Sequence, residues 1–424
     1  MTGGSGDDAL HTGALTTISG NLDGVSGNDT LAVEQSASLS AILSNIDAVS
    51  LANNVNLTTS IANNALITSA VGSNSVSLSD AGTASGTAEV ESYQLANGAN
   101  SFTLGATAVS TGVSITAGTG ADTVSGGSGN DIIDVGVDLD VDTVNAGGGS
   151  DTVSNFGAGD VVNFEGGNDT ATYTAVTAKV DGGAAIDTLT VTATSGAMTF
   201  DFSQVNAQQI TAGGTGLYRN FENLAAAAVG VDDALTVTMA STTTTTTAVT
   251  TGSGDDTITF RSQAVTVDAG AGADTLIMGG SGVIVVDLSA LGDQVSGTGA
   301  YVGFENLDGS ASFATLVAIA GGNTSFIKTG AGNDSLSGGV SLDGGAGNNN
   351  ITADARTTTV VAGSGNDNLD ASSAAQALTV NLGDGANAVL GSAHNDTVTL
   401  GAAPTPSTLA PAAIPSLLVA ATMT

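Results

Sequence analysis

Residues 118–133 read GTGADTVSGGSGNDII and contain one pattern twice, nine residues apart. In each copy two glycines that flank a variable residue are followed by a second variable residue and then by Asp122 or Asp131. An aliphatic residue, Val124 or Ile133, stands two positions after each Asp. Glycine adopts positive φ angles readily, and Asp is common in tight turns. The pattern therefore predicts a tight turn followed by a short strand.

Thirteen copies of this pattern occur along the chain, some with Asn in place of Asp. In every copy the residue two positions after the Asp or Asn is Ile, Leu or Val. These residues are Leu10, Leu31, Val124, Ile133, Val153, Leu189, Ile258, Leu276, Leu336, Ile351, Leu369, Val389 and Val398. A position that is always aliphatic indicates burial, and we expect these side chains to form the core.

The spacing of the copies indicates a solenoid. Asp151, Asp169 and Asp187 follow one another in steps of eighteen, and Asp140 follows Asp122 by the same number. A nine-residue unit that doubles to eighteen corresponds to one coil made of turn, strand, turn and strand. Stacked coils bring equivalent residues to the inter-strand distance of about 4.8 Å.

The composition supports an all-β chain and excludes several functions. Only six of the 40 acidic residues among the 424 are Glu, there are 60 Gly, and all four Pro follow residue 403. Asp beside Gly is typical of turns, and a long stretch without Pro suits continuous sheet pairing. The five basic residues are scattered, which excludes nucleic-acid binding, and the absence of Cys excludes disulfides and thiolate metal sites.

Stacked Asp side chains predict a cation site, because like charges at this distance must be protonated or bridged. Carboxylates and turn carbonyls are hard oxygen donors that suit Ca²⁺, whereas the only two His, His11 and His394, are far apart in sequence. Several Ca²⁺ ions are therefore predicted. The predicted metal ligands are Asp8, Asp29, Asp122, Asp131, Asp140, Asp151, Asp169, Asp187, Asp256, Asp274, Asp334, Asp367 and Asp396, with Gly6, Gly129, Gly254, Gly272, Gly332 and Gly365.

The units resemble the RTX, or haemolysin-type, calcium-binding nonapeptide G-G-x-G-x-D-x-U-x. The resemblance is strongest in the tandem copies at 117–134 and 251–277. It implies a parallel β-roll, or β-solenoid, with Ca²⁺ bound in glycine-rich turns, and export to the cell surface or medium by type I secretion. Asn349 and Asn387 depart from the motif, and we expect them to bind calcium weakly or to be structural. Ala185 replaces a motif glycine before Asp187.

Motif density divides the chain into segments. The predicted segments are RTX-like repeats at 1–31, an Asp-poor β-solenoid stretch at 32–115, an RTX block at 116–190, a β-solenoid spacer at 191–250, an RTX block at 251–280, a spacer at 281–328, an RTX block at 329–400 and an uncharged Pro-containing tail at 401–424. The run Thr242–Thr247 is expected to be a strand or connector rather than an ice- or sugar-binding face. No stretch predicts a transmembrane span.

A second motif, Phe-Glu-Asn-Leu, occurs twice outside the RTX blocks. Similar elements are common beside RTX units in bacterial adhesins and S-layer proteins. We expect Phe221 and Phe304 to fill the solenoid core and Glu222 and Glu305 to be solvated. Glu91 is likewise expected at a solvated edge.

These features together predict a secreted calcium-binding structural protein: an S-layer, adhesin or extracellular-matrix component that folds on Ca²⁺. The expected partners are calcium and either a second copy of the chain, in a lattice or fibre, or a cell-surface polysaccharide. No catalytic motif of the types H-E-x-x-H or G-x-S-x-G is present, so the chain is predicted not to be an enzyme. The alternatives are a polysaccharide lyase or epimerase with a β-helix fold, and a non-catalytic fragment of a larger RTX toxin or adhesin.

Overall fold

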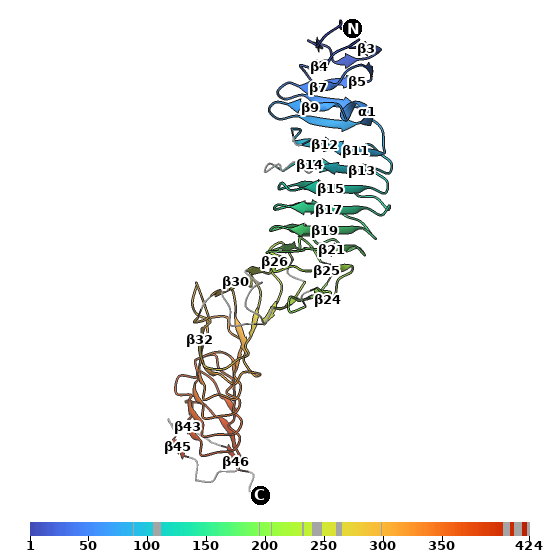
Figure 1. Cartoon of the computed structure of the whole chain (residues 1–424). Helices are drawn as coiled ribbons and strands as arrows, with labels where there is room; N and C mark the ends of the chain where they lie inside the picture. The colour runs from blue at the N-terminus through green and yellow to red at the C-terminus, as the bar shows by residue number, and fades with distance from the viewer. Residues whose placement is uncertain are drawn as a thin grey trace. The chain divides into compact units, whose positions relative to one another are not determined.

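The computed structural model describes residues 1–87, 89–104, 112–194, 196–204, 206–230, 233–239, 248–259, 265–297, 299–401, 408–410 and 418–421. The predicted all-β fold is confirmed, since short parallel strands make up almost all of its regular structure (Figure 1). The one helix among the described residues, α1, spans Ile61–Asn64. The chain divides into two compact units. Unit 1 contains Met1–Thr190, Val205–Ile210 and Gly214–Glu222, and unit 2 contains Val191–Gln204, Thr211–Gly213 and Asn223–Thr424.

Unit 1 is built from parallel sheets in which each strand pairs with the equivalent strand of the next coil. One sheet has the order β1 (Ala9–His11), β4 (Thr30–Val33), β7 (Ala48–Leu51), β9 (Ile67–Ala70). The longest has the order β2 (Thr17–Ile18), β5 (Ala37–Leu39), β8 (Asn56–Thr59), β10 (Ser75–Leu78), β12 (Ser92–Gln94), β14 (Ser114–Thr116), β16 (Ile132–Asp134), β18 (Thr152–Ser154), β20 (Thr170–Thr172), β22 (Thr188–Thr190). A third has the order β11 (Thr83–Gly86), β13 (Ser101–Leu104), β15 (Thr123–Gly127), β17 (Thr143–Gly148), β19 (Val161–Gly166), β21 (Lys179–Asp181), β25 (Leu217–Arg219), and β3 (Asn21–Asp23) pairs with β6 (Ile42–Ser44).

Unit 2 repeats this construction. One sheet has the order β23 (Met198–Asp201), β27 (Leu235–Thr238), β29 (Thr257–Thr259), β31 (Thr275–Ile277), β34 (Asn306–Asp308), β36 (Phe326–Lys328), β38 (Ser341–Asp343), β40 (Thr359–Val361), β42 (Thr379–Asn381), β44 (Thr397–Leu400), β46 (Leu418–Ala421). Its partner sheets contain β26 (Asn223–Ala225), β28 (Ala248–Thr250), β30 (Val265–Asp268), β33 (Gly299–Val302), and then β32 (Val283–Asp287), β35 (Thr315–Ile319), β37 (Ser335–Ser337), β39 (Asn350–Thr352), β41 (Asn368–Asp370), β43 (Ala388–Leu390), β45 (Thr408–Ala410). A further short strand is β24 (Ile210–Ala212).

The aliphatic motif position forms the core, as predicted. All thirteen of these Ile, Leu and Val residues are buried, with at most 6% of their surface exposed. The strand register stacks them in columns: Val124 pairs with Val144, and Val144 with Val162. Each strand contributes so few inward side chains that a coil cannot bury its apolar residues alone, and the core exists only between neighbouring coils.

The strands are not confined to the RTX blocks. The segments 32–115, 191–250 and 281–328, which are poor in Asp, also form rungs of the sheets. Within the tail, β45 pairs with β43 and β46 pairs with β44. The four Pro residues and the run Thr242–Thr247 lie outside the described residues.

Candidate metal centre

The clearest candidate site is a row of four stacked aspartates at the start of the strands β16 to β22. The backbone N–H of Asp131 donates to Oδ1 of Asp151 at 2.7 Å, and that of Asp151 donates to Oδ1 of Asp169 at 2.7 Å. Asp169 donates in the same way to Oδ1 of Asp187 at 2.8 Å. One carboxylate oxygen of each Asp thus closes a backbone hydrogen bond between consecutive coils. We call these four residues the all-aspartate row.

In ten of the thirteen aspartates predicted as metal ligands, the second carboxylate oxygen, Oδ2, is buried and has no hydrogen-bond partner among the residues that the structure describes. The ten are Asp29, Asp122, Asp131, Asp151, Asp169, Asp187, Asp256, Asp274, Asp334 and Asp367. A buried carboxylate oxygen without a donor is unfavourable by several kcal/mol, roughly, unless a cation or proton satisfies it.

No basic side chain neutralises these carboxylates in the described part of the chain. The three ion pairs in this part of the chain are His11–Glu34, Arg219–Asp181 and Arg356–Asp354, and none of them includes one of the ten aspartates. Burial, reinforced by the neighbouring carboxylates of the row, raises the pKa of Asp169 to about 6 and that of Asp187 to about 7. The stacked aspartates therefore place negative charges close together at positions where the described residues provide no positive charge.

Asparagines at the Asp position reveal which oxygen atoms surround each site. The side-chain amide of Asn100 donates from Nδ2 to the carbonyls of Ala96 and Gly98, at 2.8 and 2.7 Å, and to Oδ1 of Asp122 at 2.8 Å. These carbonyls belong to the residues four and two positions before the Asn. Three oxygen atoms therefore converge on one point, which an NH₂ group fills at Asn100. At an Asp position there is no such donor, and carbonyl and carboxylate oxygens are the ligands that Ca²⁺ prefers.

The geometry also explains the motif glycines. A Cβ atom on Gly126 would lie 2.6 Å from Oδ2 of Asp131 and would collide with the carbonyl of Ala146 in the next coil. Gly272 and Gly365, two positions before an Asp, have φ angles of 152° and 136°. Ala185 occupies the equivalent position before Asp187 with a φ of 101°, a conformation that is strained for any residue with a Cβ.

A second row in unit 1 corrects one prediction made from spacing. The N–H of Asp122 donates to Oδ1 of Asp142, and the N–H of Asp142 donates to Oδ1 of Asp160, at 2.7 and 2.8 Å. Asp140, which the eighteen-residue step predicted at this place, is exposed, and its N–H bonds to Asp138. The cause is a coil that is two residues longer: Asp142 lies twenty residues after Asp122. Sequence reasoning missed both residues: Asp142 follows no glycine motif, and Asp160 follows Gly157-Ala158-Gly159 directly, without the second variable residue of the motif.

Two other predicted ligands differ from the ten. Both oxygens of Asp396 accept hydrogen bonds within the protein, Oδ1 from the Ser392 hydroxyl at 2.7 Å and Oδ2 from the Ser392 N–H at 2.8 Å. Asp8, in the first repeat, accepts the N–H of Gly4 at Oδ2, 2.5 Å away, and is half-buried. Asp396 has therefore no oxygen left without a donor, and its Ser392 contacts close that turn.

The Phe-Glu-Asn-Leu motif belongs to the rows, which the sequence did not predict. Oε2 of Glu222 accepts the N–H of Asp187 at 2.8 Å, and Oε2 of Glu305 accepts the N–H of Asp274 at 2.9 Å. Glu222 is only 8% exposed, so the expectation that it is solvated is wrong. The longer side chain of Glu reaches the same N–H that an Asp reaches after a glycine turn. Glu91 does the same for the N–H of Asn74, at 2.6 Å, although Glu91 itself is exposed as expected.

The apolar half of the motif behaves as expected. Phe221 and Phe304 are each 1% exposed. Their backbones are held by Gln209 and Gln294, whose side-chain amides bond both the N–H and the carbonyl of the Phe. The motif therefore inserts an aromatic ring into the core and places a carboxylate at the end of an aspartate row. A Gln upstream of Phe-Glu-Asn-Leu is the signal that would have found this module.

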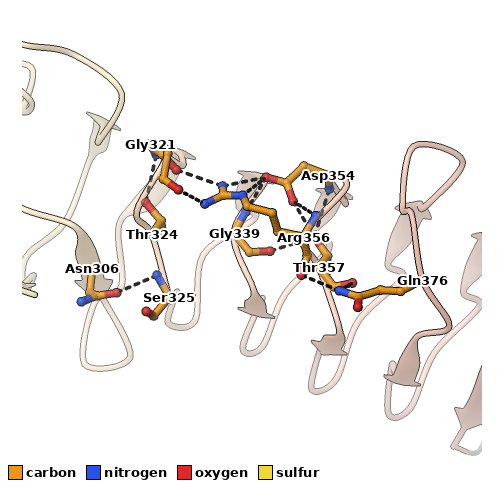
Figure 2. Close-up of polar contacts among 10 residues, drawn as sticks. Asn306, Gly321, Thr324, Ser325, Gly339, Asp354, Arg356, Thr357 and Gln376 are labelled. Atoms are coloured by element: carbon orange, nitrogen blue, oxygen red, sulfur yellow. Dashed lines mark hydrogen bonds and ion pairs between the residues drawn. The ribbon is translucent and has the colours of Figure 1, made fainter.

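In the C-terminal coils an arginine, Arg356, lies in the turn between β39 and β40 (Figure 2). The guanidinium of Arg356 donates to the carbonyls of Gly321 and Gly322 and to Oδ2 of Asp354, the last at 2.8 Å. Burial raises the pKa of Asp354, but hydrogen bonds from Arg356 and Gly339 outweigh it and bring that pKa below its ordinary value. These turns therefore contain a cation that belongs to the chain.

Side-chain clusters alone do not form a metal site here. Among the residues that the structure describes, no group of three or more His, Asp and Glu side chains is arranged to hold an ion. Backbone carbonyls must supply a large share of any coordination, as the contacts of Asn100 indicate. In the same residues no helix is long and apolar enough to cross a membrane.

Comparison with known families agrees with this geometry. The model of the RTX calcium-binding nonapeptide repeat matches four copies, within residues 114–141 and 319–340. These segments contain Asp122, Asp131 and Asp334, all of which have an unpaired buried oxygen. No curated protein matches the chain. The chain is therefore a parallel β-solenoid that carries RTX calcium-binding nonapeptide repeats.

Proposed function

We propose that the chain is a secreted structural protein, of the S-layer, adhesin or extracellular-matrix type, whose solenoid closes on binding extracellular Ca²⁺. The observation that carries the proposal is the set of ten buried Asp oxygens without a hydrogen-bond donor. A protein that folded without cations would have to protonate these groups or leave them unpaired in its interior.

Each ion is placed between two consecutive coils. Its ligands are the free Oδ2 of an Asp and the carbonyls of the residues four and two positions earlier, by analogy with the contacts of the Asn100 amide. The glycines two positions before the aspartates, Gly129, Gly254, Gly272, Gly332 and Gly365, contribute their carbonyls. In unit 1 Asp142 and Asp160 continue a row, but both oxygens of Asp160 accept backbone hydrogen bonds, from Asp142 and from Gly157, so Asp160, like Asp396, has no oxygen without a donor. Bound Ca²⁺ would supply the positive charge that the chain lacks.

Folding and binding are coupled in this proposal. The formal charge of −35 expands the metal-free chain, and facing carboxylates oppose the stacking of coils. The coils approach once the carboxylates are neutralised, which aligns the strands and buries the aliphatic column. Extracellular calcium modules of low affinity act at about 10⁻⁴–10⁻³ M, so the chain would stay open in a cytosol poor in calcium and close outside the cell.

A structural role accounts for the rest of the chain better than catalysis does. The surface is acidic, with five basic residues in the whole sequence, which disfavours a cleft for an anionic polysaccharide. Export by type I secretion is part of the proposal and rests on the RTX repeats. Repeated coils present the same groups at regular intervals, which suits self-association into a lattice or fibre, or contact with a cell-surface polysaccharide.

The test is a calcium titration of the full chain, followed by circular dichroism and light scattering. We expect a transition from coil to β-structure between about 0.1 and 1 mM Ca²⁺, reversed by EDTA. A rise in particle size with the transition would support assembly into a layer or matrix, and a folded monomer would support an adhesin rod. A chain with full β-structure in EDTA would refute calcium-coupled folding.

A further inference from the structure

A row in the C-terminal coils of unit 2 alternates Asp and Asn. The residues are Asp334, Asn349, Asp367 and Asn387, and we call them the mixed row. The N–H of Asp334 donates to Oδ1 of Asn349 at 3.0 Å, that of Asn349 to Oδ1 of Asp367 at 3.0 Å, and that of Asp367 to Oδ1 of Asn387 at 2.9 Å. The mixed row thus has the same backbone connections as the all-aspartate row of unit 1.

The two rows differ at the amide nitrogen, Nδ2, which each Asn has in place of the second carboxylate oxygen of an Asp. Nδ2 of Asn349 donates to Oδ1 of Asp367 at 3.0 Å, to the carbonyl of Gly347 at 3.2 Å and to that of Gly345 at 3.5 Å. The two glycines precede the Asn by two and four residues, as at Asn100. An NH₂ group therefore fills the point on which the turn carbonyls converge. Nδ2 of Asn387 donates to the carbonyls of Leu382 and Gly383, five and four positions before it, both at 3.3 Å.

The amides also dilute the charge of the row. In the all-aspartate row each carboxylate has another carboxylate in the next coil, about 4.8 Å away. In the mixed row the neighbours of Asp367 are two amides, so the nearest carboxylate of the row, Asp334, lies two coils away. The repulsion that opposes stacking without calcium is therefore much weaker here.

We propose that the side-chain amides of Asn349 and Asn387 take over the role of Ca²⁺ in every second coil of this row, because each NH₂ group donates to turn carbonyls that an ion would otherwise bind. The coils from about residue 329 to 401 therefore need fewer ions than the coils of the all-aspartate row, and they keep their structure when calcium is removed. This inference rests on the proposed function, since it assumes that the Asp positions bind Ca²⁺. Asn100, which precedes Asp122 in the second row of unit 1, has the same amide contacts, so the proposal applies to it as well.

The test is Asn349→Asp in the full chain, which replaces the NH₂ group by an oxygen and leaves the turn carbonyls in place. Asn381→Asp is the matched control, because Asn381 is exposed on β42, its Oδ1 accepts the N–H of Gly383 as an Asp would, and the substitution adds the same charge. Bound calcium is counted by equilibrium dialysis with elemental analysis. Hydrogen exchange of peptides covering 345–372 is measured in EDTA and in calcium.

We expect Asn349→Asp to bind one more Ca²⁺ per chain than the unmodified protein. In EDTA, peptides 345–372 should exchange at least tenfold faster than in the unmodified chain, and calcium should restore their protection. Asn381→Asp should match the unmodified chain in both measurements. In the unmodified chain in EDTA, peptides from β37, β39 and β41 should stay protected, while those from β16, β18 and β20 should exchange rapidly.

The outcomes separate this inference from the proposed function. If the unmodified chain takes up calcium but Asn349→Asp binds no additional ion, the amide does not occupy a calcium position and the inference is overturned. If the unmodified chain binds no calcium, the proposed function fails first. Asn100→Asp repeats the test in unit 1, so a failure of Asn349→Asp to fold still leaves a decisive ion count. Equal exchange of the two rows in EDTA would also overturn the inference.

Discussion

Replacing Asp151 by Asn should change stability in opposite directions with and without calcium. Asp151 lies between Asp131 and Asp169 in the all-aspartate row, and its Oδ2 is buried and unpaired. The substitution removes one charge and supplies an NH₂ group where Asn100 and Asn349 already have one. The metal-free form should gain stability, because two repulsive contacts disappear and a donor reaches the turn carbonyls.

The magnitude follows from the spacing of the coils. Two carboxylates about 4.8 Å apart repel each other by about 3.5 kcal/mol at an effective dielectric constant of about 20. Two such neighbours set an upper bound of about 7 kcal/mol, and screening and partial protonation reduce it, since the pKa values of Asp131 and Asp169 are raised to about 6. We expect a gain of about 2 kcal/mol in EDTA at pH 7.5. In calcium at about 100 times the dissociation constant, each lost ion removes about 2.7 kcal/mol, so the loss of one ion gives a net decrease of about 0.7 kcal/mol.

The assay is chemical denaturation followed by circular dichroism, with hydrogen exchange of peptides 128–172 to localise the effect. The control is Asp140→Asn, because Asp140 is exposed and lies outside the row. This control should leave both stability and the number of bound ions unchanged. A loss of stability for Asp151→Asn in EDTA as large as in calcium would refute the reasoning, because the carboxylate would then stabilise the coil without any ion.

Three further predictions concern backbone strain, the internal cation and pH. Ala185→Gly should raise the free energy of unfolding by about 1 kcal/mol in denaturant titrations, since Ala185 has a φ of 101°; an unchanged midpoint would contradict this. Arg356→Gln should lower protection of peptides 318–345 about equally in EDTA and in calcium, because it removes a cation that belongs to the chain; rescue by calcium would show that an ion can replace it. The metal-free chain should become more stable as pH falls from about 7 towards 4, because the pKa values of Asp187 and Asp274 in the folded chain, about 7, exceed the usual 3.8. Acid should also weaken calcium binding. Thermal melts in EDTA that show the reverse trend would contradict the burial of these carboxylates.

The Glu residues of the second motif show where reasoning from a pattern stops. Glu222 and Glu305 follow a Phe outside the glycine-rich blocks, and their exposure was the natural expectation for single charged residues in strand-like sequence. Their partners, the N–H groups of Asp187 and Asp274, lie 35 and 31 residues earlier. Because the inserted segment between them is longer than one coil, no fixed period connects the two positions.

The features that can be predicted from the sequence are those that one repeat specifies through its local chemistry. The glycine turn, the Asp and the aliphatic residue two positions later are specified within nine residues, so the parallel solenoid, its aliphatic core and the stacking of aspartates in consecutive coils could be predicted from the repeat and its spacing. Alternation along a strand places the aliphatic residue inside whenever the turn is in place.

The residues that form hydrogen bonds between consecutive coils could be identified only in the folded structure. A coil that is two residues longer puts Asp142 rather than Asp140 beneath Asp122, and a coil of fifteen residues sets Asn349 against Asp334. The guanidinium of Arg356 reaches glycine carbonyls 34 and 35 residues away. The physical reason is that each rung is aligned by the hydrogen bonds of the rung before it, so coil length accumulates along the stack and no nine-residue window contains it.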